Sequence, residues 1–254
     1  LLLLVVVYHM NGLPQGREGN PMNVTVIYGN RRKGSTWNAV RVLLEELSPD
    51  NIREITLPAD LPEFCTGCFS CIQRGEDHCP HRRHTAPIVE ALTGCDLLVL
   101  ATPVYAMDVS GAMKNLLDHL CFMWMSHRPD PRMFALTAVT VSTTAGAGLK
   151  HTGKTLKNSL QFFGIRRILT LHQAVAASRW EEAPEKAREK IRLRARKLAG
   201  IIRQEQEKKP WNPGLLYRTF LFRLMRAMMK KNTWNLTDRS HWETRGWLGS
   251  TRPY

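Results

Sequence analysis

Residues 23–47 read NVTVIYGNRRKGSTWNAVRVLLEEL, and this stretch decides the fold class. Asn23–Tyr28 is a short run rich in β-branched residues, which is typical of a strand. Ser35–Leu47 repeats apolar residues at helical spacing. A strand, a turn and a helix in this order open a β–α unit.

The same alternation continues along the chain. The further strands that we predict are Asn51–Leu57, Asp96–Ala101, Leu136–Val141 and Ile165–Leu171. The further helices that we predict are Pro87–Leu92, Ser110–Leu120, Thr152–Phe163 and Pro184–Gln206. Five strands alternating with helices imply an α/β fold with a parallel sheet covered on both faces. Because such sheets bind ligands beyond the carboxyl ends of their strands, the loops to inspect are 29–36, 102–110 and 142–148.

The first of these loops, Gly29–Thr36, has the spacing of a nucleotide-binding P-loop. Ser35 stands where that motif has its lysine, so the loop does not favour an NTPase. It still offers backbone N–H groups, hydroxyls and a helix N-terminus to a phosphate. The alternative is an ordinary strand-to-helix turn with a Ser or Thr cap.

The other two loops at the strand ends differ in character. Loop 102–110 combines a strand end, Pro103, Tyr105 and a helix start, and it is the most distinctive of the three. Loop 142–148 is small and rich in hydroxyl groups, which allows a ring to approach the backbone closely.

Four cysteines, Cys65, Cys68, Cys71 and Cys79, have the spacing C-x2-C-x2-C-x7-C. Such short steps let the thiols converge on one metal centre or cluster. Disulfides would need an oxidising compartment, and the rest of the chain does not look secreted. Zinc, with help from nearby histidines, and free or redox-active thiols in cationic surroundings remain alternatives. Cys95 and Cys121 lie in apolar contexts, where we expect buried small side chains.

Together the three loops resemble those of the flavodoxin-like NAD(P)H-dependent FMN reductases, which include the multimeric flavodoxins and the iron–sulfur flavoproteins. The resemblance covers about residues 23–205. It implies a doubly wound sheet of order 2-1-3-4-5, FMN as cofactor and NAD(P)H as electron donor. The implied acceptor is a quinone, a nitro compound, a metal or a protein. The alternatives are an iron–sulfur flavoprotein that carries electrons between proteins, and a binding module without catalysis.

The resemblance also implies the residues of the site. No protein acid or base is expected, because the flavin carries the chemistry. The residues expected to bind FMN are Asn30, Arg31, Gly34, Ser35 and Thr36 at the phosphate, and Pro103, Val104, Tyr105, Ala106, Met107, Thr143, Thr144 and Gly146 at the ring. The first loop is one residue shorter than the family pattern, and Asn30 replaces its usual serine. The four cysteines match the iron–sulfur motif, for which a [4Fe–4S] cluster, zinc and free thiols stay open, and we expect them beside the flavin.

Charge and hydropathy divide the chain of 254 residues into three parts. Residues 1–21, with the apolar run Leu1–Tyr8, lack the features of a signal peptide. They are expected to be a leader outside the fold, because turn-forming sequence lies just before the first strand and the fold is expected to start at Met22. Residues 22–209 are the expected FMN-binding domain. The basic excess is C-terminal: residues 1–164 hold 15 Lys and Arg against 14 Asp and Glu, and residues 165–254 hold 21 against 8.

The third part, residues 210–254, is expected to be a helical extension with an apolar face along residues 216–229. Its partner is expected to be the home domain or a second copy, then an anionic membrane surface, then nucleic acid. We therefore expect a cytoplasmic homodimer or homotetramer that binds no nucleic acid, and membrane contact is not the primary expectation. The acceptor and the choice between NADH and NADPH are not encoded in these patterns.

Overall fold

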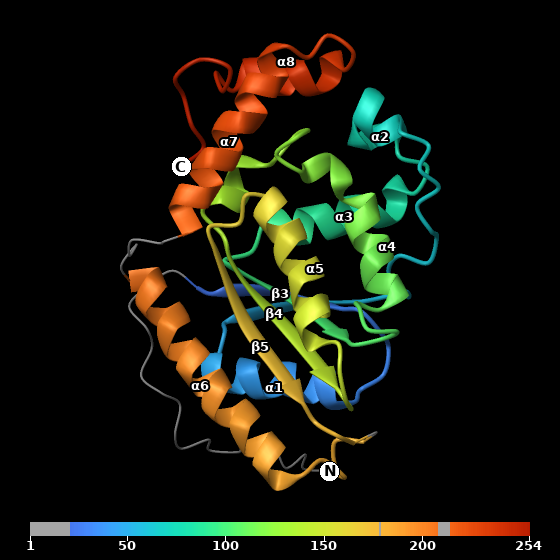
Figure 1. The fold of residues 1–254 in the computed structure, drawn as a ribbon, viewed down its shortest axis with the longest axis vertical. Helices are drawn as coiled ribbons and strands as arrows, with labels where there is room; N and C mark the ends of the chain where they lie inside the picture. Colours follow the sequence, from blue (N-terminus) through green and yellow to red (C-terminus); the bar gives the residue numbers. More distant parts are fainter. Residues whose placement is uncertain (1–20, 178, 208–213) are drawn as a thin grey trace, which may run out of the picture.

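The computed structural model describes residues 21–177, 179–207 and 214–254. Its centre is a five-stranded, all-parallel sheet in the order β2-β1-β3-β4-β5 (Figure 1), which confirms the predicted fold class. The strands are β1 Asn23–Tyr28, β2 Asn51–Thr56, β3 Leu97–Pro103, β4 Thr137–Thr144 and β5 Arg167–Ala174. The predicted leader lies outside the described residues except for Pro21.

Helices cover both faces of the sheet and extend beyond it. They are α1 Ser35–Leu47, α2 Ser70–Gln73, α3 Arg82–Thr93, α4 Gly111–His119, α5 Leu149–Phe162, α6 Glu185–Glu207, α7 Gly214–Lys230 and α8 Leu236–Thr244. Short 3-10 turns lie at Glu76–His78, Cys121–Met123 and Pro131–Phe134. None of the helices in the described ranges is both long and apolar enough to cross a membrane.

Two separate cores hold the layers together. Helices α1 and α6 pack on one face, where Val40, Leu43 and Ile191 are fully buried against the sheet. Helices α3, α4 and α5 pack on the other face through Leu92, Leu116 and Leu156. The central strands β1, β3 and β4 are buried on both faces, and β4 buries the hydroxyl residues Thr137, Thr140 and Ser142 among its apolar ones.

Helix α3 begins earlier than predicted. The sequence predicts a start at Pro87, since proline favours the first turn. The structure starts the helix at Arg82, where the N–H of Thr85 already donates to the carbonyl of His81 (3.0 Å). The helix includes Pro87 in its interior. Arg82, Arg83 and His84 therefore belong to the first turn of a helix and not to a basic loop.

Helix α7 packs on the home domain through a third apolar cluster. Leu221, Phe222, Met225 and Met229 meet Phe134 of the main domain there, together with Met125, Trp242 and Trp247. The rings of Phe222 and Trp242 stack with centroids 4.9 Å apart. Arg218 adds a hydrogen bond to the carbonyl of Phe134 (2.7 Å). One face of the predicted C-terminal helix is thereby buried.

Phe222→Ala tests this packing. Phe222 is fully buried, so its truncation removes apolar contacts and leaves a cavity. We expect the free energy of unfolding to fall by about 3–5 kcal/mol, measured by urea denaturation. Phe220→Ala is the matched control on the same helix, since the Phe220 side chain is 64% exposed, and its loss should stay below about 1 kcal/mol. Equal losses for the two variants would contradict this orientation of α7.

Candidate functional site

An open cavity of about 200 Å³ lies beyond the carboxyl ends of the strands, at the point where the strand order reverses. We call it the strand-end cavity. Its walls come from the loops after β1, β3, β4 and β5. The residues that line it are Asn30, Arg32, Gly34, Ser35, Thr36, Pro103, Val104, Tyr105, Thr143, Thr144, Ala145, Val175 and Ala177.

One end of the strand-end cavity is built for an anion. Helix α1 starts there at Gly34, with no side-chain cap and no acidic residue in its first turn. Its first backbone bond runs from the N–H of Asn38 to the carbonyl of Gly34 (3.0 Å), so the preceding N–H groups point out of the helix end. The Ser35 hydroxyl and the Arg32 side chain line the same end. Unpaired N–H groups, the helix dipole and a guanidinium together favour a phosphate.

Buried hydroxyl contacts fix the three loops to one another. The hydroxyls of Thr36 and Thr143 lie 2.7 Å apart and join the start of α1 to the end of β4. The Ser110 hydroxyl donates to the carbonyl of Gly29 (2.6 Å) and joins the loops after β3 and β1. A Cβ atom at position 29 would lie 2.7 Å from the hydroxyl oxygen of Ser110, so the Ser110–Gly29 contact requires glycine.

The loop after β3 presents Tyr105 and Met107 to solvent on a strained turn. The backbones of Tyr105 and Asp108 bond to each other in both directions (2.9 and 3.0 Å). The two residues between them, Ala106 and Met107, have φ of 47° and 70°, which is the left-handed pattern of a type I′ turn. Asn30 also donates to the Tyr105 hydroxyl (2.9 Å). Strain of this kind persists where surrounding contacts hold it, and it is common at ligand sites.

Most of the FMN residues predicted from sequence face one cavity. Arg31, Ala106, Met107 and Gly146 do not line it, although they lie in the loops that form it. Arg32 lines it in place of its neighbour Arg31. Val175 and Ala177 were missed because β5 was predicted to end at Leu171, whereas the structure continues it to Ala174.

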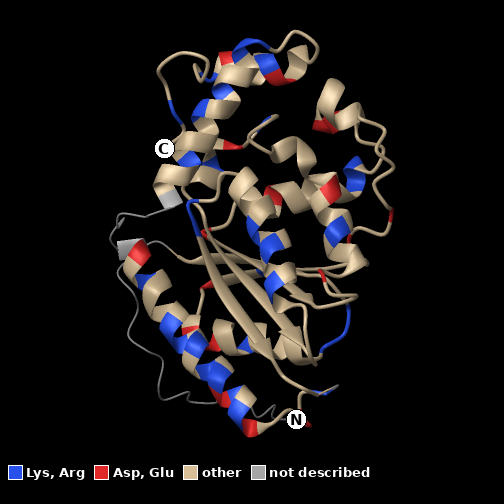
Figure 2. Ribbon diagram, viewed as in Figure 1, with Lys and Arg blue, Asp and Glu red and all other residues tan. Residues whose placement is uncertain are grey.

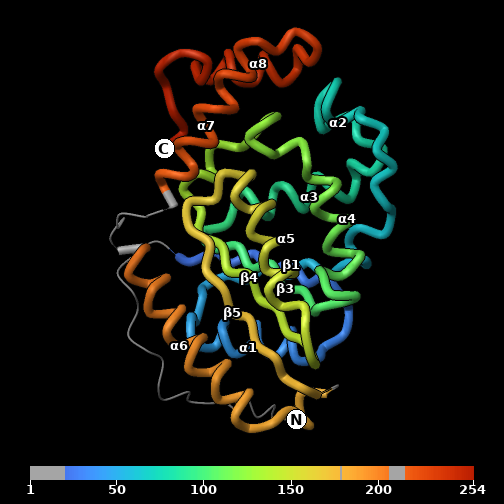
Figure 3. Tube along the Cα trace, viewed as in Figure 1, coloured from blue at the N-terminus to red at the C-terminus, as the bar shows by residue number. Residues whose placement is uncertain are grey.

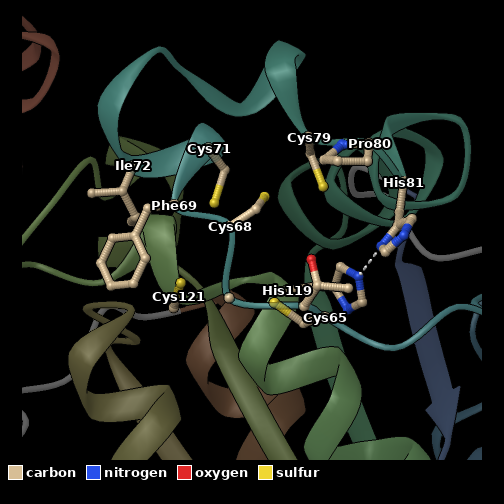
Figure 4. A pocket seen from close by; sticks show the side chains of 12 residues that line it. Cys65, Cys68, Phe69, Cys71, Ile72, Cys79, Pro80, His81, His119 and Cys121 are labelled. Atoms are coloured by element: carbon tan, nitrogen blue, oxygen red, sulfur yellow. Dashed lines mark hydrogen bonds between the residues drawn. The ribbon is translucent and has the colours of Figure 1, made fainter.

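The four motif cysteines line a second, largely apolar cavity of about 70 Å³, here called the cysteine cavity (Figure 4). It lies between the loop that carries α2 and the end of α4. Its walls include Cys65, Cys68, Cys71, Cys79, Cys121, Phe69, Pro80, His81 and His119. Cys121 was predicted to be an ordinary buried side chain, and its sequence neighbours give no sign that it is a fifth thiol of this cavity. Among the residues that the structure describes, no group of three or more His, Cys, Asp or Glu has the geometry to hold a metal ion.

Neighbouring groups alter the acidity of these thiols. A hydrogen bond from Cys121 lowers the pKa of Cys71 to about 7, and Arg128 contributes to the same shift. The same hydrogen bond and burial raise the pKa of Cys121. The backbone N–H of Ser70 lowers the pKa of Cys68, while burial raises that of Cys79. Of this pair, Cys71 is therefore the more acidic thiol.

Two histidines border the cysteine cavity as a fixed pair. His119 is buried, and its Nδ1 lies 2.9 Å from the carbonyl of Asn115, which can only accept. Its Nε2 therefore accepts a hydrogen bond from Nδ1 of His81 (2.9 Å). Burial lowers the pKa of His119, which agrees with this neutral form.

The C-terminal extension holds the cysteine loop in place. Arg128 donates to the carbonyls of Cys71 and Ile72, and it forms a buried ion pair with Asp238 at the start of α8. Asn235 donates to the carbonyl of Ile72 (3.1 Å) and to Asp238 (2.7 Å). The sequence gives no sign of this connection, since the residues involved are up to 163 positions apart.

The two cavities share no lining residue. Helix α4 runs from Ser110, beside the strand-end cavity, to His119 in the wall of the cysteine cavity. At 1.5 Å per residue Ser110 and His119 are roughly 13–14 Å apart along the helix. The motif cysteines lie together as predicted, but the structure does not place them beside the strand-end cavity of the same chain.

Parts of the chain are similar in sequence to known proteins. The chain is 29% identical over 111 residues to an iron–sulfur flavoprotein of Archaeoglobus fulgidus, covering 42% of this chain and 49% of that one. It is 33% identical over 95 residues to FMN-dependent NADH:quinone oxidoreductase 3 of Pseudomonas aeruginosa, covering 34% and 44%. The chain thus spans about half the length of the curated relatives it matches.

Solved structures share the fold. An FMN-dependent NADH-azoreductase from Bacillus anthracis, in complex with FMN, superposes with a TM-score of 0.52 at 13% identity, over 70% of this chain and 99% of that one. An NAD(P)H:quinone oxidoreductase from Methanothermobacter marburgensis gives 0.53 at 14% identity, over 71% and 96%. The family description "NADPH-dependent FMN reductase" matches residues 22–182, which is more than half of the chain. The chain therefore belongs to the NADPH-dependent FMN reductase family.

Proposed function

We propose that the protein is an FMN-dependent NAD(P)H oxidoreductase that binds FMN in the strand-end cavity. The observation that carries the proposal is the combination, in one cavity, of an anion site at the start of α1 and a glycine- and hydroxyl-rich wall. FMN needs both, since it has a single phosphate at one end and a flat ring at the other. Bound FMN would accept a hydride from the nicotinamide and pass the electrons to an acceptor.

The protein's part in this proposal is to bind and orient the flavin. Ser35, Arg32 and the N–H groups of α1 would hold the phosphate. Pro103, Val104 and Tyr105 would contact the ring on one side, with Thr143 and Thr144 on the other. The Thr36–Thr143 and Ser110–Gly29 contacts keep these walls fixed, so little ordering is left to occur on binding.

The acceptor proposed is a quinone, a nitro compound, a metal or a protein. The Pseudomonas relative is named for a quinone, which places quinones first for testing. The protein is also proposed to form a homodimer or homotetramer and to work in the cytoplasm.

A second candidate function, electron transfer between proteins through an iron–sulfur cluster, is favoured by the cysteine cavity. Four motif thiols and Cys121 line one apolar space, and two relatives from Archaeoglobus fulgidus are named iron–sulfur flavoproteins. In a [4Fe–4S] cluster each cysteine binds a different iron, so its ligands need not surround a single point as the ligands of one zinc ion must. The donor set therefore suits a cluster better than zinc, with Cys65, Cys68, Cys71 and Cys79 as the ligands.

Anaerobic mixing with NADH and with NADPH tests the first proposal. FMN-loaded protein should lose its yellow absorbance with one of these donors, and an added quinone should restore it. Protein that holds no FMN, or FMN that neither nicotinamide reduces, would refute the proposal.

Arg32→Ala should raise the dissociation constant for FMN by about tenfold or more, because a charged hydrogen bond to the phosphate is lost. Affinity for riboflavin, which has no phosphate, should not change. Titration of the apoprotein followed by flavin fluorescence measures both constants. Arg31→Ala is the matched control for the neighbouring position, and a larger effect there would reassign the phosphate contact to the residue that the family resemblance implies.

Cys68→Ser should abolish bound iron and acid-labile sulfide in protein purified without oxygen, and it should leave the FMN content unchanged. The reason is that the two cavities share no residue. Cys95→Ser, at a half-buried cysteine outside the cysteine cavity, is the control and should keep its iron. Loss of FMN together with iron would show that the cysteine loop supports the flavin site.

Asp238→Asn should destabilise the cysteine loop, because it removes the buried carboxylate that pairs with Arg128 and leaves only the half-exposed Glu76, 3.2 Å away, as a counter-charge. Removing one partner of a buried pair costs about 3–5 kcal/mol, and we expect iron content to fall while FMN stays bound. Glu243→Gln, which breaks only the exposed pair with Arg239, should change neither. Full iron content in Asp238→Asn would mean that the extension does not hold the loop.

A further inference from the structure

Helix α7 is apolar on two faces, and only one of them is covered. Leu221, Phe222, Met225 and Met229 are buried against the home domain. The neighbouring face exposes Leu216 (72%), Tyr217 (47%), Phe220 (64%), Leu224 (44%) and Met228 (58%). Tyr217, Phe220, Leu224 and Met228 recur every three or four residues, and Leu216 adjoins them at the start of the helix, so the five form one continuous row, here called the exposed row. Exposed apolar rows of this length mark an interaction site.

Cations border the exposed row. Arg223 and Lys230 are seven positions apart, which places them on one side of α7, and both are exposed together with Lys231 beyond its end. Helix α7 contains no Asp or Glu. Figure 2 shows Lys and Arg along this helix, and Figures 1 and 3 place it at the end of the molecule away from α1 and α6. The row is therefore accessible and lies in a positive surrounding.

A second copy of the chain is a poor partner for this surface. A two-fold contact brings each patch against itself, so Arg223 and Lys230 of the two copies would face one another. The helix offers no carboxylate to neutralise them. A partner needs to be apolar where the row lies and negative beside it.

We propose that the exposed row docks on the surface of an anionic lipid bilayer. Interfacial helices combine aromatic and aliphatic side chains on one face with Lys and Arg beside them, and lie in the plane of the membrane. The buried face of α7 stays in the protein core, so the helix remains part of the fold while Leu216, Phe220 and Leu224 enter the headgroup region. The phosphates of acidic lipids pair with Arg223 and Lys230. The sequence favours the home domain over a membrane surface as the partner of this helix. Because one face of α7 packs on the home domain and another is exposed, the helix can contact both.

Sedimentation with vesicles tests the proposal on the full chain. The protein should sediment with vesicles of phosphatidylcholine and phosphatidylglycerol, and added salt should weaken binding. It should stay in solution with phosphatidylcholine alone. Arg223→Glu with Lys230→Glu should reduce the partition coefficient at least tenfold, since each cation near such a surface is worth about fivefold. Phe220→Ser with Leu224→Ser should reduce it by a similar factor.

The matched control is Lys154→Glu with Lys157→Glu on α5, which makes the same change in net charge at exposed positions away from α7. It should bind almost as well as the unchanged chain. If both charge variants lost vesicle binding equally, net charge alone would explain the loss, and the proposal would be overturned. No sedimentation with anionic vesicles would also overturn it. So would a lipid-free dimer that becomes monomeric on Phe220→Ser with Leu224→Ser, because a second copy would then cover the row.

Discussion

The parallel pairing of β1 with β3 is the constraint on which both sites depend. Val24 pairs with Leu97 and Tyr28 with Ala101, so the two strands end side by side and their loops leave at the same edge. β1 also pairs with β2 on its other side, which puts the reversal of strand order beside these loops. The Ser110–Gly29 contact then fixes where α4 starts, and the far end of α4 supplies His119 and leads into Cys121 of the cysteine cavity.

The residues that follow local rules were predictable from sequence. β1 and α1 have the predicted bounds, because β-branched alternation and helical spacing act within a few residues. Loop 29–36 was recognisable for the same reason, since an anion site at a helix start is made by consecutive residues. The family resemblance supplied the strand order and the cofactor, which local patterns do not determine.

What sequence patterns missed depends on contacts between distant segments. Cys121 joins the cysteine cavity only because α4 brings it under the loop of Cys71, and its own neighbours suggest nothing but burial. The Arg128–Asp238 pair spans 110 positions and follows no spacing rule. The separation of the two cavities likewise depends on how α4 packs between distant segments, which local patterns do not determine. Arg32 lines the strand-end cavity and its neighbour Arg31 does not, a distinction that an arginine-rich loop does not reveal.

The connection between α8 and the cysteine loop has a consequence for biosynthesis. Asn235 and Thr237 donate to the carbonyls of Ile72 and Gln73, and Asp238 pairs with Arg128, which bonds the same loop. The loop lacks these partners while residues 235–238 are still inside the ribosome. The strand-end cavity is made by residues 30–177 and needs none of them. The cysteine loop therefore gains its full set of hydrogen-bond partners only after residues 235–238 have left the ribosome, whereas all the residues of the strand-end cavity emerge earlier.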